Sequence, residues 1–120
     1  MYKAPKVLII QENGRHDGNR DFRECHCLAR AFTLRGVVAE VWGLGHENYG
    51  KQPDLYEYLN SFDLIINIES HDVEWMPDLS RVSAKKFLWA VDAHCKTTKP
   101  YDNEFDKGNY DVLLHSTKDY

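Results

Sequence analysis

Two polar side chains, Asp92 and His94, come directly after the most apolar stretch of the chain. The segment from 85 to 94 has the sequence KKFLWAVDAH, in which an unbroken apolar run precedes the acid and the imidazole. A strand buried on both faces of a parallel sheet needs such a run. Because ligands of open α/β sheets bind beyond the carboxyl ends of the strands, the pattern predicts that both side chains lie at that edge.

The residue types at positions 92 and 94 suit proton transfer. Their side chains point the same way if the extended backbone continues that far. A histidine with an ordinary pKa of about 6.5 can accept a proton from a hydroxyl, and a nearby carboxylate fixes its tautomer and raises its basicity. His94 could also simply hydrogen-bond a hydroxyl group. The alternative is structural, with Asp92 capping a turn and His94 in a solvated loop.

A second candidate is the polar loop from 13 to 20, with the sequence NGRHDGNR. Its backbone N–H groups and its two arginines come just before an expected helix, and this combination favours an anion such as a diphosphate. Asn13, Gly14, Arg15 and Arg20 are the candidate ligand-binding residues. The glycine spacing fits neither a dinucleotide fingerprint nor a Walker loop, and an ordinary surface connection is the alternative.

A third polar cluster, with the sequence ESHD, follows another apolar run at 63–69. In a parallel sheet, Glu69 and His71 would line the same edge as the first loop or the end of the 85–91 strand. A polar turn is the alternative interpretation.

Metal binding and hydrolase chemistry find little support in the sequence. Cys25, His26 and Cys27 lie inside an expected helix, where residues two apart point about 200° apart, so the two thiols cannot chelate one ion. Cys25 is instead expected to be a small core residue. The sequence has no G-x-S-x-G elbow for a serine nucleophile. We therefore expect no metal and no cofactor. Trp75, in a polar stretch, is the tryptophan expected to be exposed.

The elements expected to position these residues alternate along the chain. Apolar runs predict strands at 6–11, 37–42, 63–69, 86–91 and 111–115. A helix is expected between the first two strands, with Asp21 and Glu24 as a capping-box variant and Gly36 as its stop. Further helices are expected from Pro53, near Pro77 and at 103–107. Parallel strands need crossover connections, so the prediction is an α/β fold: a three-layer Rossmann-like parallel sheet of about five strands with helices on both faces.

Chain length and charge limit the kinds of protein that this sequence can represent. The 120 residues suit one Rossmann-like domain, 1–120, and the net charge of −4 with scattered cations argues against nucleic-acid binding. No stretch approaches the ~20 apolar residues of a membrane span. The N-terminal segment resembles no signal peptide, and the odd number of cysteines fits reduced thiols, so a cytoplasmic protein is expected.

Several of these segments together resemble the N-terminal half of a GT-B-type glycosyltransferase of the group-1 or CgeB-like kind. They are KVLIIQENG, a helix ending in LRG before VVAEVW, then DLIINIE, KKFLWAVDAH and YDVLLHSTKDY. The resemblance implies two Rossmann-like domains, in which the C-terminal domain mostly holds the nucleotide-sugar donor and the N-terminal domain mostly holds a glycan or other hydroxyl acceptor. This chain would be the acceptor-side half, with the C-terminal domain of the same parent protein as its partner and His94 as the first catalytic candidate. Such a half would be inactive alone.

A stand-alone flavodoxin-like binding or signalling module is the alternative. Receiver domains of that fold need an acidic pair after the first strand and a phospho-acceptor aspartate after the third. The corresponding positions here hold Gln11-Glu12 and Glu69-Ser70, which counts against a receiver.

Overall fold

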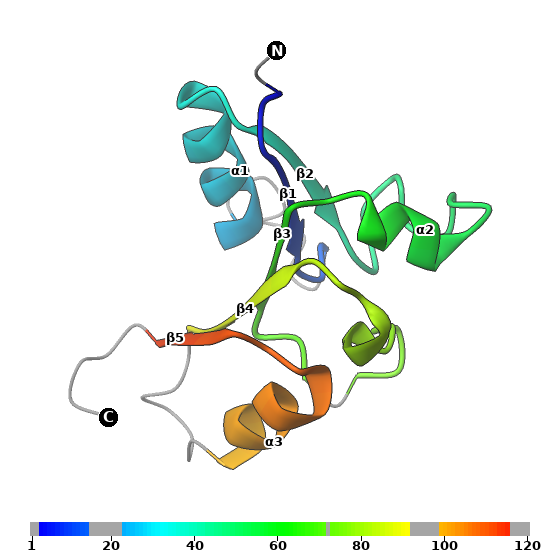
Figure 1. Cartoon of the computed structure of the whole chain (residues 1–120), viewed down its shortest axis with the longest axis vertical. Coiled ribbons are helices and arrows are strands. Elements are labelled where there is room, and N and C mark those ends of the chain that lie inside the picture. The colour runs from blue at the N-terminus through cyan, green and yellow to red at the C-terminus, as the bar shows by residue number, and fades with distance from the viewer. Residues whose placement is uncertain (1–2, 15–22, 72, 92–98, 116–120) are drawn as a thin grey trace.

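The computed structural model describes residues 3–14, 23–71, 73–91 and 99–115 (Figure 1). All five expected strands are present and form one parallel sheet in the order β2-β1-β3-β4-β5. The elements in chain order are β1 (Lys6–Ile10), α1 (Glu24–Leu34), β2 (Val38–Trp42), α2 (Leu55–Asn60), β3 (Leu64–Ile68), the 3₁₀ helix η2 (Leu79–Arg81), β4 (Lys85–Ala90), α3 (Lys99–Gly108) and β5 (Val112–His115). The predicted α/β class is therefore confirmed.

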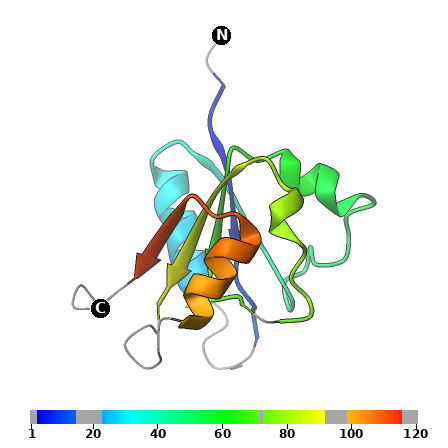
Figure 2. The same cartoon turned by 60° about the horizontal axis from the view of Figure 1, so that its bottom comes forward.

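Helices cover both faces of the sheet, as predicted. In Figure 2, α3 lies in front of the sheet and α1 lies behind it. From β1 the chain moves toward one edge of the sheet to form β2, and from β3 to β5 it moves toward the opposite edge. Crossover connections in parallel sheets are right-handed. The helices of the two halves therefore cover opposite faces.

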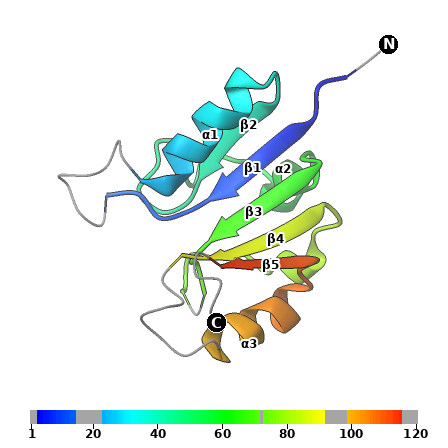
Figure 3. The same ribbon diagram turned by 90° about the vertical axis from the view of Figure 1, so that its left-hand side faces the viewer.

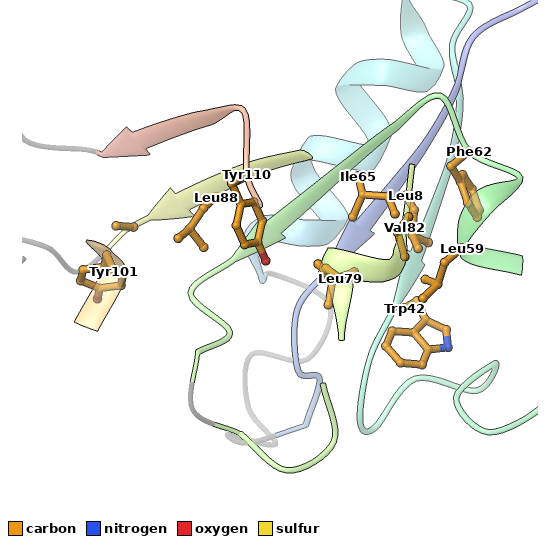
Figure 4. Packing of buried hydrophobic residues seen from close by; sticks show 12 residues of the cluster. Leu8, Trp42, Leu59, Phe62, Ile65, Leu79, Val82, Leu88, Tyr101 and Tyr110 are labelled. Atoms are coloured by element: carbon orange, nitrogen blue, oxygen red, sulfur yellow. The ribbon is translucent and has the colours of Figure 1, made fainter. Parts of the chain in front are cut away.

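The larger core lies on the face covered by α2, η2 and α3 (Figure 4). Alternate residues of the central strands point into it, including Leu8, Ile65 and Leu88, each fully buried. Leu59 of α2 and Leu79 of η2 cover them. Burying one such side chain stabilises the fold by about 1.5–3 kcal/mol, so this layer supplies much of the stability.

The smaller core lies under α1. Val7, Ile9 and Ile66 point to this face, and Cys25 of α1 is fully buried against them, which confirms its expected place in the core. Burial, the largest cause, raises the pKa of the Cys25 thiol to about 11. The thiol is therefore protonated near neutral pH and is a poor nucleophile.

Helix α1 begins differently from the capping-box expectation. Its N-cap is Arg23, whose side chain makes no capping hydrogen bond. The side chain of Gln11, at the end of β1, instead accepts a hydrogen bond from the Cys25 backbone N–H at 2.9 Å and donates one to Glu24 at 3.2 Å. Asp21, the expected N-cap, lies outside the described residues, and Glu24 is the first residue of the helix rather than the third.

Strand β4 is less buried than its apolar run predicts. Leu88 and Ala90 are buried on the larger-core face, but Phe87 and Trp89 on the α1 face are only half-buried. Leu114 of β5, paired with Trp89 in register, is 41% exposed. Among the described residues no helix lies over this part of the sheet: Figure 3 shows α1 beside β1 and β2.

Two other side chains lie where the sequence did not predict. Trp75 is half-buried, and its ring packs 6.1 Å from that of Trp42 and 6.4 Å from that of Tyr49, so the expected exposure was wrong. Lys86 is 3% exposed, and its ammonium group donates to the carbonyls of Leu79 and Val82 at 2.9 and 2.7 Å. It thereby caps the end of η2.

No helix in the described ranges has the length and apolar character needed to cross a membrane.

Candidate functional site

The loops that leave the carboxyl ends of the strands share one edge of the sheet, because all five strands run in the same direction. Figure 3 shows the arrowheads of β1, β3, β4 and β5 pointing to this edge. We call it the carboxyl rim. Asn13, Gly14, Glu69 and His71 lie on it after β1 and β3. The other predicted site residues, Arg15, Arg20, Asp92 and His94, lie outside the described residues.

Backbone hydrogen bonds join the loops that follow β1 and β2. The backbone N–H of Gln11 donates to the carbonyl of Trp42 at 3.2 Å, and that of Asn13 donates to Leu44 at 2.8 Å, so the pairing of the two strands continues beyond their ends. A Cβ atom on Gly45 would lie 1.8 Å from the Asn13 carbonyl oxygen. Only glycine permits this approach, and its φ of +94° also favours glycine.

His46 lies in the β2 loop with its ring turned back onto β1. It is 9% exposed, and its Nε2 lies 2.8 Å from the Gln11 carbonyl oxygen. Since a carbonyl only accepts hydrogen bonds, Nε2 carries the proton and Nδ1 keeps its lone pair. Burial is the main cause that lowers the pKa of His46, and Arg23 and His26 add to the effect, although the Gln11 bond opposes it. His46 is therefore a neutral imidazole of fixed tautomer near pH 7.

A cavity of about 500 Å³ lies beside this ring, between the first turn of α1 and the β2 loop. The His26 ring, from α1, packs against the His46 ring in a T-shaped arrangement with a centroid distance of 5.5 Å. We call this space the rim cavity; it is lined by Asn13, His26, Val41, Gly45, His46, Glu47 and Asn48.

Buried polar atoms without a hydrogen-bond partner in the described part of the chain gather around the rim cavity. They are the Oδ1 atoms of Asn13 and Asn48, Nε2 of His26, and Nε of the neighbouring Arg23. Leaving one such atom unsatisfied costs about 1–3 kcal/mol. Folded proteins keep few of them, and each calls for a specific explanation. A group of such atoms at one cavity is typical of a place where a ligand completes the hydrogen bonding.

The loop after β3 forms a second polar cluster on the rim. Glu69 has a φ of +64°, which is unusual for a residue other than glycine, and its Oε2 accepts a hydrogen bond from the Tyr101 hydroxyl at 2.8 Å. The ring of His71 packs 4.8 Å from that of Tyr101, and its Nδ1 lies 3.0 Å from the Glu69 carbonyl oxygen. The Glu69 backbone N–H donates to Trp89, so this cluster adjoins β4, one of the two neighbours expected for it.

The side chain of Asn67 stabilises this second cluster through hydrogen bonds. Its Oδ1 accepts from the Ser70 N–H at 3.1 Å, and its Nδ2 donates to the Ser70 carbonyl and to the Tyr110 hydroxyl, both at 2.7 Å. Asn67 is fully buried, and Ser70 and Tyr110 are each 5% exposed. The three residues hold the turn in which Glu69 adopts its left-handed conformation.

Sequence reasoning found one side of the rim cavity and missed the other. Asn13 is among the predicted ligand-binding residues, and His26 lies in the segment weighed only for metal binding. His46 and Asn48 lie in the segment 43–52, which contains three glycines and for which the sequence predicts no binding role. Two glycines within three residues of His46 were the available signal, since such glycines often mark a close backbone approach. Within the described residues, no three His, Cys, Asp or Glu side chains gather closely enough to hold a metal ion.

Comparison of the chain with protein-family models, with curated proteins and with solved structures gave no match.

Proposed function

We propose that the chain is the acceptor-binding, N-terminal domain of a GT-B-type glycosyltransferase, which transfers a sugar from a nucleotide-sugar donor to a glycan or another hydroxyl-bearing acceptor. The proposal joins the sequence resemblance to the position of the polar groups. Fold alone does not define a function, so the argument depends on the site.

The observation that carries the proposal is the rim cavity. It lies beyond the carboxyl ends of β1 and β2, at the same edge of the sheet along which open parallel sheets bind their ligands. Its polar lining consists mainly of amide and imidazole groups from Asn13, His26, His46 and Asn48. Such groups both accept and donate hydrogen bonds, and they suit a ligand rich in hydroxyls.

In this proposal the two domains of the parent protein bind different substrates. A C-terminal Rossmann-like domain would hold the nucleotide and the donor sugar, and the rim of this chain would orient the acceptor hydroxyl. Holding the two reactants in place supplies much of the rate enhancement in such two-substrate reactions. The chain alone would bind acceptor without turnover. We place the protein in the cytoplasm, where free thiols such as those of Cys25 and Cys27 stay reduced.

The test is a titration of the isotope-labelled chain followed by NMR. Oligosaccharide acceptors should shift the backbone amide signals of the rim, and nucleotide sugars should shift them far less. Transferase activity should appear only when the chain is joined to its C-terminal domain. Tighter binding of nucleotide sugars than of any oligosaccharide, or activity that does not depend on this chain, would contradict the proposal.

The strand order favours a second candidate, a flavodoxin-like binding module. The order 2-1-3-4-5 is that of flavodoxin-like sheets, which bind their ligand at the β1/β3 crevice. Saturable binding of a phosphorylated ligand such as flavin mononucleotide, with shifts in the loops after both β1 and β3, would support this candidate.

A further inference from the structure

We infer that the rim cavity recognises an uncharged ligand that presents at least two hydroxyl hydrogens, and that the Oδ1 atoms of Asn13 and Asn48 accept them. This inference rests on the proposed function, because it names the ligand class of the same site. It follows from which hydrogen-bonding atoms lack partners and from the charges around them.

The two asparagine oxygens need donors. Asn48 donates from Nδ2 to the Val41 carbonyl at 2.9 Å. Rotating its amide would place two carbonyl oxygens against each other, so Oδ1 is held as the group without a partner among the described residues. The backbone of Asn13 is fixed by its hydrogen bond to Leu44, and its Oδ1 is buried without a partner in the same part of the chain. Both atoms accept hydrogen bonds and cannot donate them.

His46 also lines the cavity and keeps an acceptor atom of its own. Its Nε2 proton is used by the Gln11 carbonyl at 2.8 Å, which leaves the Nδ1 lone pair for a hydrogen bond. This bond and the T-shaped contact with the His26 ring hold the His46 ring in place. A hydroxyl that donates to Nδ1 is also the group from which an imidazole can accept a proton.

Charge and hydrogen-bonding capacity together disfavour the two other common classes of small ligand. A carboxylate or a fully ionised phosphate group would present only acceptors to the acceptor atoms of Asn13 and Asn48, and any anion would also face the Glu47 carboxylate, which lines the cavity. An ammonium ligand would supply donors but would meet the positive charge of Arg23, which acts on His46 from close by. A neutral hydroxyl donates to the asparagine oxygens, and its own oxygen can accept from Arg23 Nε.

The inference is tested by titrating the isotope-labelled full chain with three kinds of probe. These are neutral saccharides (glucose, galactose and maltose), inorganic phosphate and methylammonium chloride. At least one saccharide should give saturable shifts of the backbone amide signals of Asn13, His26, His46 and Asn48. Phosphate and methylammonium should give no saturable shift at these positions.

Variants then assign the contacts to the asparagines. Asn13→Ala and Asn48→Ala should each weaken saccharide binding about tenfold, which is what the loss of one well-formed hydrogen bond in a buried site produces. Asn103→Ala, on the exposed surface of α3, is the matched control and should leave the affinity unchanged. The fold of each variant is checked by the dispersion of the NMR spectrum.

Several outcomes would overturn the inference. One is the absence of binding by any saccharide, and another is saturable binding of phosphate or methylammonium in the cavity. A third is unchanged affinity in both asparagine variants. Saccharide binding elsewhere on the carboxyl rim would overturn this inference but leave the proposed function standing. Saccharide binding in the cavity, with transfer by the two-domain protein unaffected by Asn13→Ala, would support the inference and contradict the proposed function.

Discussion

The two polar clusters on the carboxyl rim contain similar residues but differ in how many of their hydrogen-bonding atoms have partners. In the cluster after β3, the side chain of Asn67 makes three hydrogen bonds. Around the rim cavity after β1 and β2, Asn13 and Asn48 each keep a buried oxygen without a partner in the described part of the chain. A completed network stabilises the fold, whereas an incomplete one costs stability and is retained where a ligand uses it.

The difference extends to the backbone. The turn after β3 holds Glu69 in the left-handed region by means of side-chain hydrogen bonds to its neighbours. The loop after β2 reaches its close approach to β1 through glycines instead. Side-chain bonds therefore set the shape of one loop, and the absence of side chains sets the shape of the other.

The largest effect is expected for Gly45→Ala. Its Cβ would lie 1.8 Å from the backbone oxygen of Asn13, and its φ is +94°, so the two loops must separate. We expect the free energy of unfolding to fall by about 3–5 kcal/mol, from overpacking and backbone strain together. Gly50→Ala is the control, because Gly50 has a φ of +76° but open space around it; it should lose only about 1 kcal/mol. Urea denaturation measures both, and equal losses would refute the close-approach argument.

Asn67→Ala should have the next largest effect. The change leaves the Ser70 N–H and the Tyr110 hydroxyl without their buried partner, so the free energy of unfolding should fall by about 3 kcal/mol. Tyr110→Phe removes one member of the same network and should cost about 1 kcal/mol. A loss below 1 kcal/mol for Asn67→Ala would show that the second cluster is not the stabilising one.

His46 predicts a pH dependence of stability. Its pKa in the folded protein is lowered from the ordinary value of 6.5, mainly by burial, so between these two pKa values the unfolded chain binds more protons than the folded one. Stability should therefore fall as the pH drops below about 6.5, by at most about 1.4 kcal/mol per pH unit from this one group. Comparing His46→Gln with wild type between pH 7.5 and 5 isolates this contribution.

His115→Gln, at an exposed position at the end of β5, is the control for the pH experiment. It should keep the wild-type dependence, whereas His46→Gln should flatten it. An unchanged slope in His46→Gln would mean that His46 does not stay neutral in the folded protein.

The smallest effect on stability is expected for Asn13→Ala, and it should be clearly smaller than the effect of Asn67→Ala. The substitution removes an oxygen that has no partner among the described residues, so the free energy of unfolding should change by less than about 0.5 kcal/mol or should rise slightly. Thermal denaturation measures it. A loss approaching that of Asn67→Ala would mean that Asn13 is a structural residue and would weaken the case for a ligand.

The fold was predictable because its signals are local and repeated. Apolar runs such as those at 6–10 and 64–68 are long enough to mark buried parallel strands, and the helices between them fix the sheet as parallel. Gln11 shows where this reasoning stops. It looked like the polar end of a strand, yet its side chain caps α1 and its carbonyl fixes the tautomer of His46.

The candidate site was predictable only in its location. The carboxyl rim and Asn13 followed from the direction of the strands. The approach of the β2 loop to β1 brings His46 and Asn48 to the same cavity. It depends on contacts between distant segments, such as the one between Gln11 and His46, which are 35 residues apart, and no local pattern encodes them. The predicted roles of Asp92 and His94 remain predictions, because these residues lie outside the described ranges.

The burial of the strands decreases from the middle of the sheet toward β5. Four of the five residues of β1 are buried, whereas β5 pairs only with β4, and its last two residues, Leu114 and His115, are exposed. Amide hydrogens of β1 should therefore exchange with solvent only through global unfolding, and those of β5 through local opening of much lower free energy. In an unfolding pathway, β5 would be the first strand to detach, and the β1–β3 pair would be the last to separate.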